Sequence, residues 1–168
     1  MSPDTVIVDE CWSSSGMLRQ VLDLRKSKTF FRSRGSIGWG LPGALGVKLG
    51  LPVKPVVAVV GDGRAGWSIQ SLWTAARYRI PVTFVVTNNA TYRQVKLVRK
   101  IVLGDYPLSE KHEGMELDEP VLNSSMIAQS MGVRGESVKD PGDLGRVLKA
   151  AFNSGEPRLV EVFVENRP

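Results

Sequence analysis

Two apolar stretches end in polar residues that could bind a metal ion and a phosphorylated ligand. Residues 55–60 are followed by Gly61-Asp62-Gly63, and residues 81–86 stop just before Asn88-Asn89. Both stretches are rich in β-branched residues and bounded by turn residues, as expected for strands buried on both faces. Apolar residues 69, 72, 73 and 76 lie between them at helical spacing. A strand–helix–strand crossover places both strand ends at one edge of a parallel sheet, so we expect Asp62 and Asn89 to meet there.

These residue types suit a divalent metal ion that holds a diphosphate. Carboxylate and amide oxygens are hard ligands for Mg²⁺ or Ca²⁺, and phosphate oxygens can fill the remaining coordination positions. Gly61 and Gly63 would let a ligand approach the backbone closely. A helix after this turn would direct free N–H groups and the positive end of its dipole at the phosphates. Because a carboxylate repels phosphate, Asp62 in this place indicates a cation between the two.

The same motif resembles the signature of a known enzyme family. Gly61-Asp62-Gly63 and Asn88-Asn89 are separated by twenty-four residues, and this arrangement is similar to the diphosphate-binding motif of thiamine-diphosphate enzymes. The surrounding stretches, residues 38–42, 71–81 and 88–92, look most like benzoylformate decarboxylases among the 2-oxo acid decarboxylases and acetolactate synthases. The likeness runs from about residue 5 to residue 164 and covers only the C-terminal, diphosphate-side third of such enzymes.

The resemblance implies a set of site residues. The metal ligands would be Asp62, Asn89 and the backbone carbonyl of Thr91. The carbonyl of Gly35 would accept a hydrogen bond from the aminopyrimidine of thiamine diphosphate, and Ile37 would hold the cofactor in a bent shape that positions its reactive carbon. The full set of cofactor-binding residues implied in this way is Ser13, Ser14, Gly35, Ile37, Gly61, Asp62, Gly63, Arg64, Ala65, Asn89, Thr91 and Tyr92. Two simpler interpretations stay open: helix capping for the serines and a core position for Ile37.

The resemblance also implies that the chain is one part of a composite site. The glutamate that activates the cofactor belongs, in the family, to the pyrimidine-side domain of a partner chain, so we assign no catalytic side chain here. We expect Mg²⁺-dependent binding of thiamine diphosphate, a role in 2-oxo acid decarboxylation or carboligation, and a homo- or hetero-oligomer with a complementary pyrimidine-side domain. The isolated chain, whether an excised domain or a small subunit, is expected to be inactive.

Three residues depart from the family pattern. Relatives usually carry a small hydroxyl residue at the position of Trp12, and small residues at Arg64 and near Arg93. Arg64 would either add a charge-assisted bond to the diphosphate or point into solvent. These departures keep open a non-catalytic module that binds a diphosphate or a nucleotide.

A dinucleotide-binding domain is the other alternative. Residues 61–66 satisfy the G-x-G-x-x-G pattern of NAD(P)-binding oxidoreductases. The second strand ends in Thr87-Asn88-Asn89, however, and lacks the acidic residue that binds the ribose in such folds. The sequence therefore disfavours this alternative.

Composition excludes several other classes. The 168 residues form one expected domain, 1–168, with a net charge of +5 and one cysteine. The basic clusters at residues 25–34 and 93–100 lack interleaved aromatic residues, so we expect no nucleic-acid partner. No run of apolar residues is long enough to span a membrane. The start lacks the pattern of a signal peptide, and a lone cysteine fits a reducing, cytoplasmic setting.

The expected fold is α/β, a three-layer α/β/α sandwich with a mainly parallel, doubly wound sheet. Residues 101–122, polar and interrupted by glycine and proline, are expected to form a long loop, and Met126, Ile127 and Met131 to face the core. The expected strands are residues 5–10, 29–31, 55–60, 81–86, 135–138 and 159–164, and the expected helices are residues 16–24, 41–50, 69–76, 124–132 and 140–152.

Overall fold

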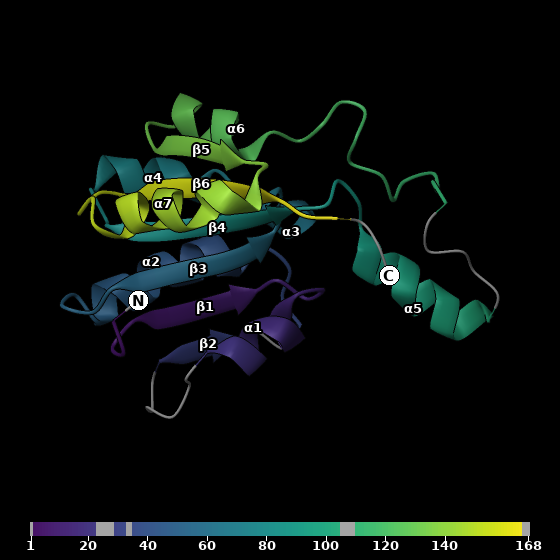
Figure 1. Ribbon diagram of the computed structural model, residues 1–168, viewed down its shortest axis with the longest axis horizontal. Helices are drawn as coiled ribbons and strands as arrows, with labels where there is room; N and C mark the ends of the chain where they lie inside the picture. Colours follow the sequence, from purple (N-terminus) through teal and green to yellow (C-terminus); the bar gives the residue numbers. More distant parts are fainter. Residues whose placement is uncertain (1, 23–28, 33–34, 105–109, 166–168) are drawn as a thin grey trace.

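The computed structural model describes residues 2–22, 29–32, 35–104 and 110–165, and its centre is one six-stranded sheet (Figure 1). The strand order is β2-β1-β3-β4-β6-β5, and all five pairs of neighbouring strands are parallel. The strands are β1 (Val6–Glu10), β2 (Phe30–Arg32), β3 (Val56–Gly61), β4 (Val82–Asn88), β5 (Arg134–Val138) and β6 (Arg158–Phe163).

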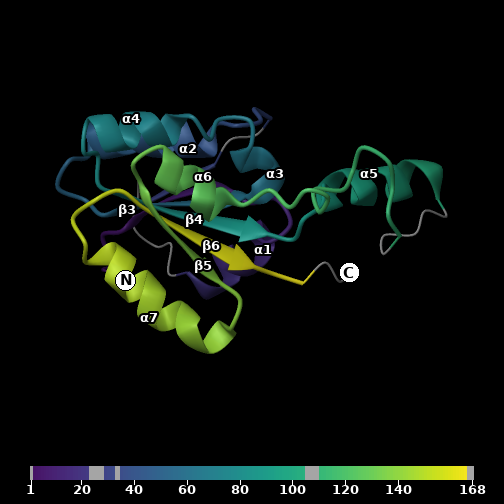
Figure 2. The ribbon, with the colours of Figure 1, turned by 90° about the horizontal axis from the view of Figure 1, so that it is seen from above.

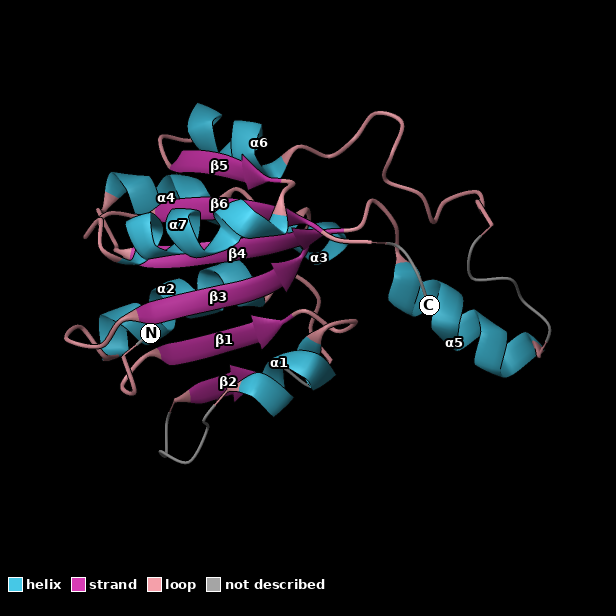
Figure 3. Cartoon of the chain, in the orientation of Figure 1, coloured by secondary structure: helices cyan, strands magenta, loops and turns pink. Residues whose placement is uncertain are grey.

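Helices cover both faces of this sheet, which confirms the expected three-layer α/β/α fold (Figure 2). One face carries α2 (Gly40–Gly50), α3 (Asp62–Ala65), α4 (Ser71–Arg77) and α6 (Ser124–Ser130), and the other carries α1 (Ser15–Val21) and α7 (Pro141–Phe152). Helix α5 (Arg93–Leu103) packs on neither face and extends away from the carboxyl edge of the strands (Figure 3). No helix in the described ranges is long and apolar enough to cross a membrane.

The two faces of the sheet bury separate apolar cores because successive side chains of a strand point to opposite faces. Val6 and Val8 of β1 belong to the larger core, under α2, α4 and α6, whereas Ile7 between them packs with α1 on the other face. Phe84 of β4 is fully buried in the larger core. Strands covered on both sides explain the continuous apolar stretches of the sequence.

The expected elements agree with the structure except in four places. The first helix was expected to reach Leu24 but ends at Val21, and residues 23–28 lie outside the described part of the chain. The helix expected over residues 69–76 is α4, which begins at Ser71, and the four-residue α3 at the Gly-Asp-Gly turn is an additional helix. Helix α5 was not expected from the sequence, and the loop expected from residue 101 was wrong at its start, since residues 101–103 belong to α5. Met126 is 65% exposed, because α6 turns Ser124, Ser125 and Ala128 inward instead.

The chain reverses direction across the sheet between its first and third strands. From β1 it runs outward to β2 at one edge, then returns so that β3 lies on the other side of β1. The connections that leave the carboxyl ends of β1 and β3 therefore diverge. Open α/β sheets bind ligands at such a point because diverging loops leave a crevice above the strand ends.

A buried carboxylate joins three parts of the fold at this edge. Glu161 of β6 is fully buried and accepts hydrogen bonds from Nδ2 of Asn88 at 2.8 Å and from the backbone N–H of Ser124 at 3.0 Å. It also accepts from the backbone N–H of Ser125 at 3.3 Å and from Oγ of Ser137 at 3.0 Å. These donors stabilise the charge that burial would otherwise penalise. Glu161 thereby ties β4, β5 and the start of α6 to β6.

We expect Glu161→Ala to lower the free energy of unfolding by about 3 kcal/mol or more, because it leaves several buried donors without an acceptor. Urea denaturation monitored by circular dichroism measures this. Glu156→Ala, at an exposed position after α7, is the matched control and should change stability by less than about 0.5 kcal/mol. Equal stabilities of the two variants would contradict the assigned role of Glu161.

Candidate cofactor-binding site

A cavity of about 430 Å³ lies at the carboxyl edge of the sheet, where the loops after β1 and β3 diverge. Four segments form it: the turn after β1, the turn after β3, the end of β4 with the start of α5, and the end of the last strand. Its lining residues are Cys11, Trp12, Ser13, Ser14, Met17, Gly61, Asp62, Gly63, Arg64, Thr87, Asn89, Thr91, Tyr92, Arg93, Gln94, Val164 and Glu165.

Asp62 is the first residue of α3 and is only 4% exposed. Its Oδ2 accepts a hydrogen bond of 2.9 Å from the backbone N–H of Ala90. Burial raises the pKa of Asp62 from 3.8 to about 6, although hydrogen bonds from backbone groups of Gly63, Ala90 and Asn89 partly oppose this shift. The carboxylate is therefore incompletely compensated by the protein, as a group that awaits a cation would be.

The turn after β4 places the second half of the motif beside Asp62. Gly61 pairs with Thr87 in the parallel register, so the residues that follow each strand emerge side by side. Oδ1 of Asn89 accepts a 3.3 Å hydrogen bond from the backbone N–H of Thr91. Ala90 between them has φ = 54°, a left-handed conformation that costs a non-glycine residue about 1 kcal/mol. The strained turn places Asn89 and Thr91 in the wall of the cavity.

Two sets of contacts hold this turn in place. On one side, the backbone N–H of Ala90 lies 2.9 Å from Oδ1 of Asn88 as well as from Asp62, and Asn88 is itself bonded to Glu161. On the other side, Oγ1 of Thr91 and the backbone N–H of Tyr92 both donate to the carbonyl of Met115, at 2.8 Å each. The metal-ligand candidates are thus positioned by neighbours before any ligand arrives.

Gly63 is required by the packing of the site itself. A Cβ added to Gly63 would lie 2.5 Å from the ring of Tyr92, closer than real side-chain contacts allow. A Cβ on Gly61, in contrast, would meet no atom within 4 Å, so Gly61 leaves open space beside Asp62. The first position leaves room for the Tyr92 ring and the second leaves room at the backbone for a ligand.

Nine of the twelve residues expected to bind the cofactor line this one cavity: Ser13, Ser14, Gly61, Asp62, Gly63, Arg64, Asn89, Thr91 and Tyr92. Gly35 and Ile37 do not line it, and both are exposed on the loop before α2. The Ala65 side chain is fully buried in the larger core, so only the backbone of this residue could face a ligand. Ser14 stands at the N-cap of α1 without a side-chain capping bond, and capping therefore does not account for it.

The helix expected after the Gly-Asp-Gly turn is present, but it is short. Helix α3 has four residues, and α4 begins at Ser71. A helix dipole grows with the number of aligned peptide groups, and a four-residue helix therefore exerts only a weak electrostatic field on a phosphate group. Backbone N–H groups of the turn and charged side chains would therefore provide most of the attraction for a phosphate group.

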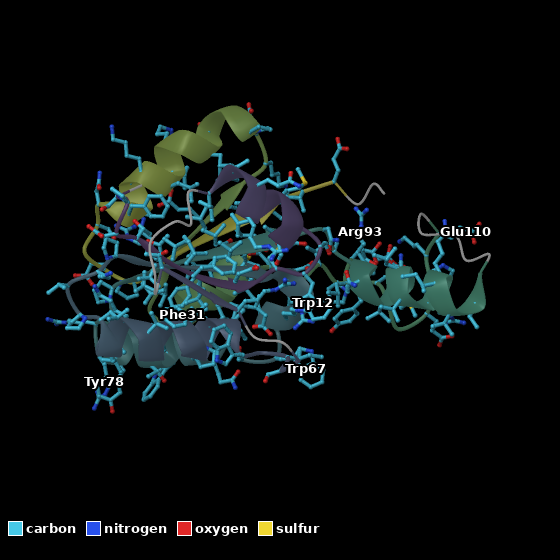
Figure 4. The ribbon with its side chains drawn as sticks, turned by 90° about the horizontal axis from the view of Figure 1, so that it is seen from below. Trp12, Phe31, Trp67, Tyr78, Arg93 and Glu110 are labelled. Atoms are coloured by element: carbon cyan, nitrogen blue, oxygen red, sulfur yellow. The ribbon has the colours of Figure 1, made fainter. Side chains whose placement is uncertain are left out.

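The Arg64 side chain lines the cavity and also contacts Glu10 and Trp12. Its Nη1 lies 3.2 Å from Oε1 of Glu10, and its guanidinium carbon lies 4.9 Å from the centre of the Trp12 ring. Figure 4 shows Trp12 on the side of the domain that faces α5. Two of the three departures from the family pattern are therefore in contact with each other.

Sequence reasoning missed two carboxylates that organise the site. Glu10 is 1% exposed and accepts hydrogen bonds from the backbone N–H groups of Gly38 and Gly40. Glu161 positions Asn88 as described above. The signal available for each was a charged residue inside or at the end of an apolar strand, since carboxylates are buried only when compensated.

Comparisons with known proteins agree with this site. Residues 13–162 match the family model described as "Thiamine pyrophosphate enzyme, C-terminal TPP binding domain". The chain is 32% identical over 160 residues to a benzoylformate decarboxylase of Pseudomonas aeruginosa, which covers 95% of this chain and 29% of the relative. It is 36% identical over 118 residues to an acetolactate synthase large subunit of Buchnera aphidicola, covering 70% of this chain and 20% of the relative.

Solved structures give the same result. A thiamine diphosphate-dependent 4-hydroxybenzoylformate decarboxylase of Rhodococcus jostii superposes with a TM-score of 0.87 at 31% identity, over 96% of this chain and 30% of that one. A benzoylformate decarboxylase of Polynucleobacter necessarius also gives a TM-score of 0.87, at 25% identity, over 97% and 30% of the two chains. This chain thus spans less than a third of the length of these relatives. With its sheet order, its Gly-Asp-Gly and Asn-Asn turns at one cavity and a family match over most of its length, the chain belongs to the C-terminal thiamine pyrophosphate-binding domains of thiamine pyrophosphate enzymes.

Proposed function

We propose that the chain binds thiamine diphosphate through Mg²⁺ and serves as the diphosphate-side part of a 2-oxo acid decarboxylase or carboligase. The observation that carries this proposal is the convergence of Asp62, Asn89 and Thr91 on one cavity, at the point where the connections after β1 and β3 diverge. The substrate class is suggested by the relatives named as benzoylformate decarboxylases, since benzoylformate is a 2-oxo acid.

The donor set supports a hard divalent cation shared with phosphate. Asp62 offers a carboxylate oxygen, Asn89 an amide oxygen and Thr91 a backbone carbonyl, all ligands that Mg²⁺ accepts. Among the described residues, no group of three or more His, Cys, Asp or Glu side chains is placed to hold a metal. A site with one carboxylate leaves positions for phosphate oxygens, which fits a metal that arrives with a diphosphate.

The residues of this chain are proposed to bind and orient the cofactor, and none is assigned an acid–base role. Bound thiamine diphosphate supplies the electron sink for decarboxylation of a 2-oxo acid. Asp62, Asn89 and Thr91 would hold the metal, and Ser13 and Ser14 would contact the diphosphate from the turn after β1. The reaction needs a pyrimidine-side domain from elsewhere, which we place on a partner chain in a homo- or hetero-oligomer.

The exposed apolar face of α5 supports an incomplete site. Ile101, Val102 and Leu103 are each at least 60% exposed, and Val95 and Val98 are about half exposed. Gln94 at the start of the same helix lines the cavity. An apolar helix face that begins at the ligand site suits contact with a further protein surface.

A non-catalytic binding module is the second candidate. The contact between Trp12 and Arg64 favours it, because these residues occupy one wall of the cavity where relatives were expected to carry small side chains. Co-expression with a pyrimidine-side domain that carries the activating glutamate separates the two candidates. Restored decarboxylation of a 2-oxo acid supports the enzyme, and cofactor binding without turnover supports the module.

We expect Asp62→Ala to weaken Mg²⁺-dependent binding of thiamine diphosphate by at least about a hundredfold, since it removes the only carboxylate among the proposed metal ligands. Isothermal titration of the cofactor with Mg²⁺, and again with EDTA, measures this. Asp143→Ala at the exposed start of α7 is the control, and NAD tests the dinucleotide alternative. Undiminished binding by a folded Asp62→Ala variant would refute the metal assignment.

The burial of Asp62 yields a second expectation, for the ligand-free chain. The pKa of Asp62 is about 6 in the folded state and 3.8 in the unfolded chain, so the folded state holds the proton more tightly. The free energy of unfolding of the wild type therefore falls as the pH rises from about 4 to about 6. Asp62→Asn keeps the shape without the charge, so it should be more stable than the wild type by up to about 3 kcal/mol near neutral pH, with the gain disappearing below about pH 4.

Urea denaturation without Mg²⁺ at several pH values tests this expectation. Asp143→Asn serves as the exposed control and should show no such dependence. A gain in stability that does not change with pH would mean that desolvation of the Asp62 carboxylate is not its cause.

A further inference from the structure

Trp12 and Arg64, in the wall of the cavity, form a connected cluster with Glu10 behind them, and neither the family pattern nor the metal site explains it. Glu10 ends β1, Trp12 follows it by two residues, and Arg64 belongs to α3. Trp12 and Arg64 both line the cavity. The distances of 4.9 Å from the guanidinium to the Trp12 ring and 3.2 Å to Glu10 indicate a held side chain, since such contacts restrict a long flexible residue.

The guanidinium is held in a way that leaves part of it available. The hydrogen-bonded contacts of Arg64 in the described part of the chain run through Nη1, to Glu10 and, at 3.4 Å, to the carbonyl of Ser36. One flat face covers Trp12. No described protein group accepts a hydrogen bond from Nε or Nη2. Arginine binds phosphate with two parallel N–H donors, and Nε and Nη2 form one such pair.

A second arginine, Arg32, also contacts the Trp12 ring and restricts its movement. Arg32 of β2 lies 5.6 Å from the Trp12 ring centre, and the same arginine is 3.7 Å from the buried carboxylate of Asp9. The ring is therefore in contact with two guanidinium groups, each tied to a carboxylate at the end of β1. A small hydroxyl residue at position 12 could donate one hydrogen bond to a ligand but could not support Arg64.

The charge balance of the cavity requires a cation on this side. Glu10 and Asp62 are both buried carboxylates: Asp62 lines the cavity, and Glu10 lies behind it, 3.2 Å from the cavity-lining Arg64. The backbone N–H groups of Gly38 and Gly40 stabilise Glu10 but carry no net charge. Arg64 neutralises Glu10, so a diphosphate would meet a guanidinium there instead of a carboxylate, just as a metal would shield it from Asp62.

We propose that Arg64 is a direct ligand of the diphosphate group, and that Trp12 and Glu10 are positioning residues that hold its guanidinium for this contact. The proposal rests on the proposed binding of a diphosphate cofactor, and it makes the two departures from the family pattern a single unit. A charged donor supported by an aromatic ring replaces the hydroxyl donor that position 12 lacks.

The test measures binding of Mg²⁺-pyrophosphate and of Mg²⁺-thiamine diphosphate to the full chain by isothermal titration. Arg64→Ala should weaken pyrophosphate binding about ten- to a hundredfold, the effect of losing one charge-assisted pair of hydrogen bonds. It should also lower the dependence of binding on salt. Arg64→Lys should restore only part of the affinity, because an ammonium group lacks the flat fork. Arg146→Ala, on the exposed face of α7, is the matched control and should bind as the wild type does.

A double-mutant cycle tests the positioning role of Trp12. Trp12→Ala removes the ring without adding a hydroxyl donor; it should weaken pyrophosphate binding several-fold when Arg64 is present and should have no effect in the Arg64→Ala background. Trp12→Phe keeps a ring face and should retain most of the affinity. Equal effects of Trp12→Ala in both backgrounds would overturn the positioning role.

Folding is controlled separately, because Arg64→Ala leaves Glu10 buried without its cation. The double variant Arg64→Ala/Glu10→Gln removes that charge, and we expect it to remain folded, though less stable because a Gln amide can accept from only one of the Gly38 and Gly40 N–H groups, and still to bind pyrophosphate weakly. Pyrophosphate affinity within about twofold of the wild type in this variant would show that Arg64 is only the counter-ion of Glu10, and would overturn the proposal.

The two ligands distinguish failure of this proposal from failure of the proposed function. Arg64-dependent binding of pyrophosphate without binding of thiamine diphosphate supports the anion site and counts against the cofactor. Binding of thiamine diphosphate that is unchanged in the Arg64→Ala variant supports the proposed function and counts against Arg64 as a ligand of the diphosphate. Absence of pyrophosphate binding at millimolar concentration overturns the proposal, because a preformed arginine site needs no partner domain, and the proposed function is then decided by the co-expression experiment.

Discussion

The parallel pairing of β1, β3 and β4 is the constraint on which the rest of the structure depends. Parallel strands place all their carboxyl ends at one edge, so the turns after Glu10, Gly61 and Asn88 are neighbours although they are far apart in the chain. The outward step to β2 then separates the connections after β1 and β3 and opens the cavity between them. Every residue assigned to the metal or the diphosphate belongs to one of these turns.

Three buried carboxylates at this edge are compensated in three different ways, and the difference explains their roles. Glu161 is surrounded by backbone and side-chain donors and is structural. Glu10 has two glycine N–H groups and the cation Arg64, which together anchor the loop before α2. Asp62 receives only backbone hydrogen bonds, and burial raises its pKa. The least compensated carboxylate is the one that a metal ion would stabilise, because binding then supplies what folding did not.

Much of the fold and the central part of the site could be predicted from the sequence. Apolar stretches such as residues 55–60 and 81–86 are long, β-branched and bounded by turn residues, so their strands were found nearly to the residue. Residues 101–103 and Met126 were misjudged, because a short or projecting helix is shaped by tertiary contacts more than by its own pattern. Gly35 and Ile37 lie outside the cavity of this chain, so their expected contact with the pyrimidine stays a prediction.

The sequence alone determined the α/β class, the position of Gly61-Asp62-Gly63 at the end of one strand and that of Asn88-Asn89 at the end of another, because strand and turn signals are local. Only the tertiary structure decided that Trp12 supports Arg64, that Glu10 holds both Arg64 and the glycine-rich loop, and that Glu161 positions Asn88. Each of these contacts joins residues that are between 28 and 73 positions apart in the sequence. Their geometry is set by the strand order and the parallel register, which no single stretch of the chain encodes.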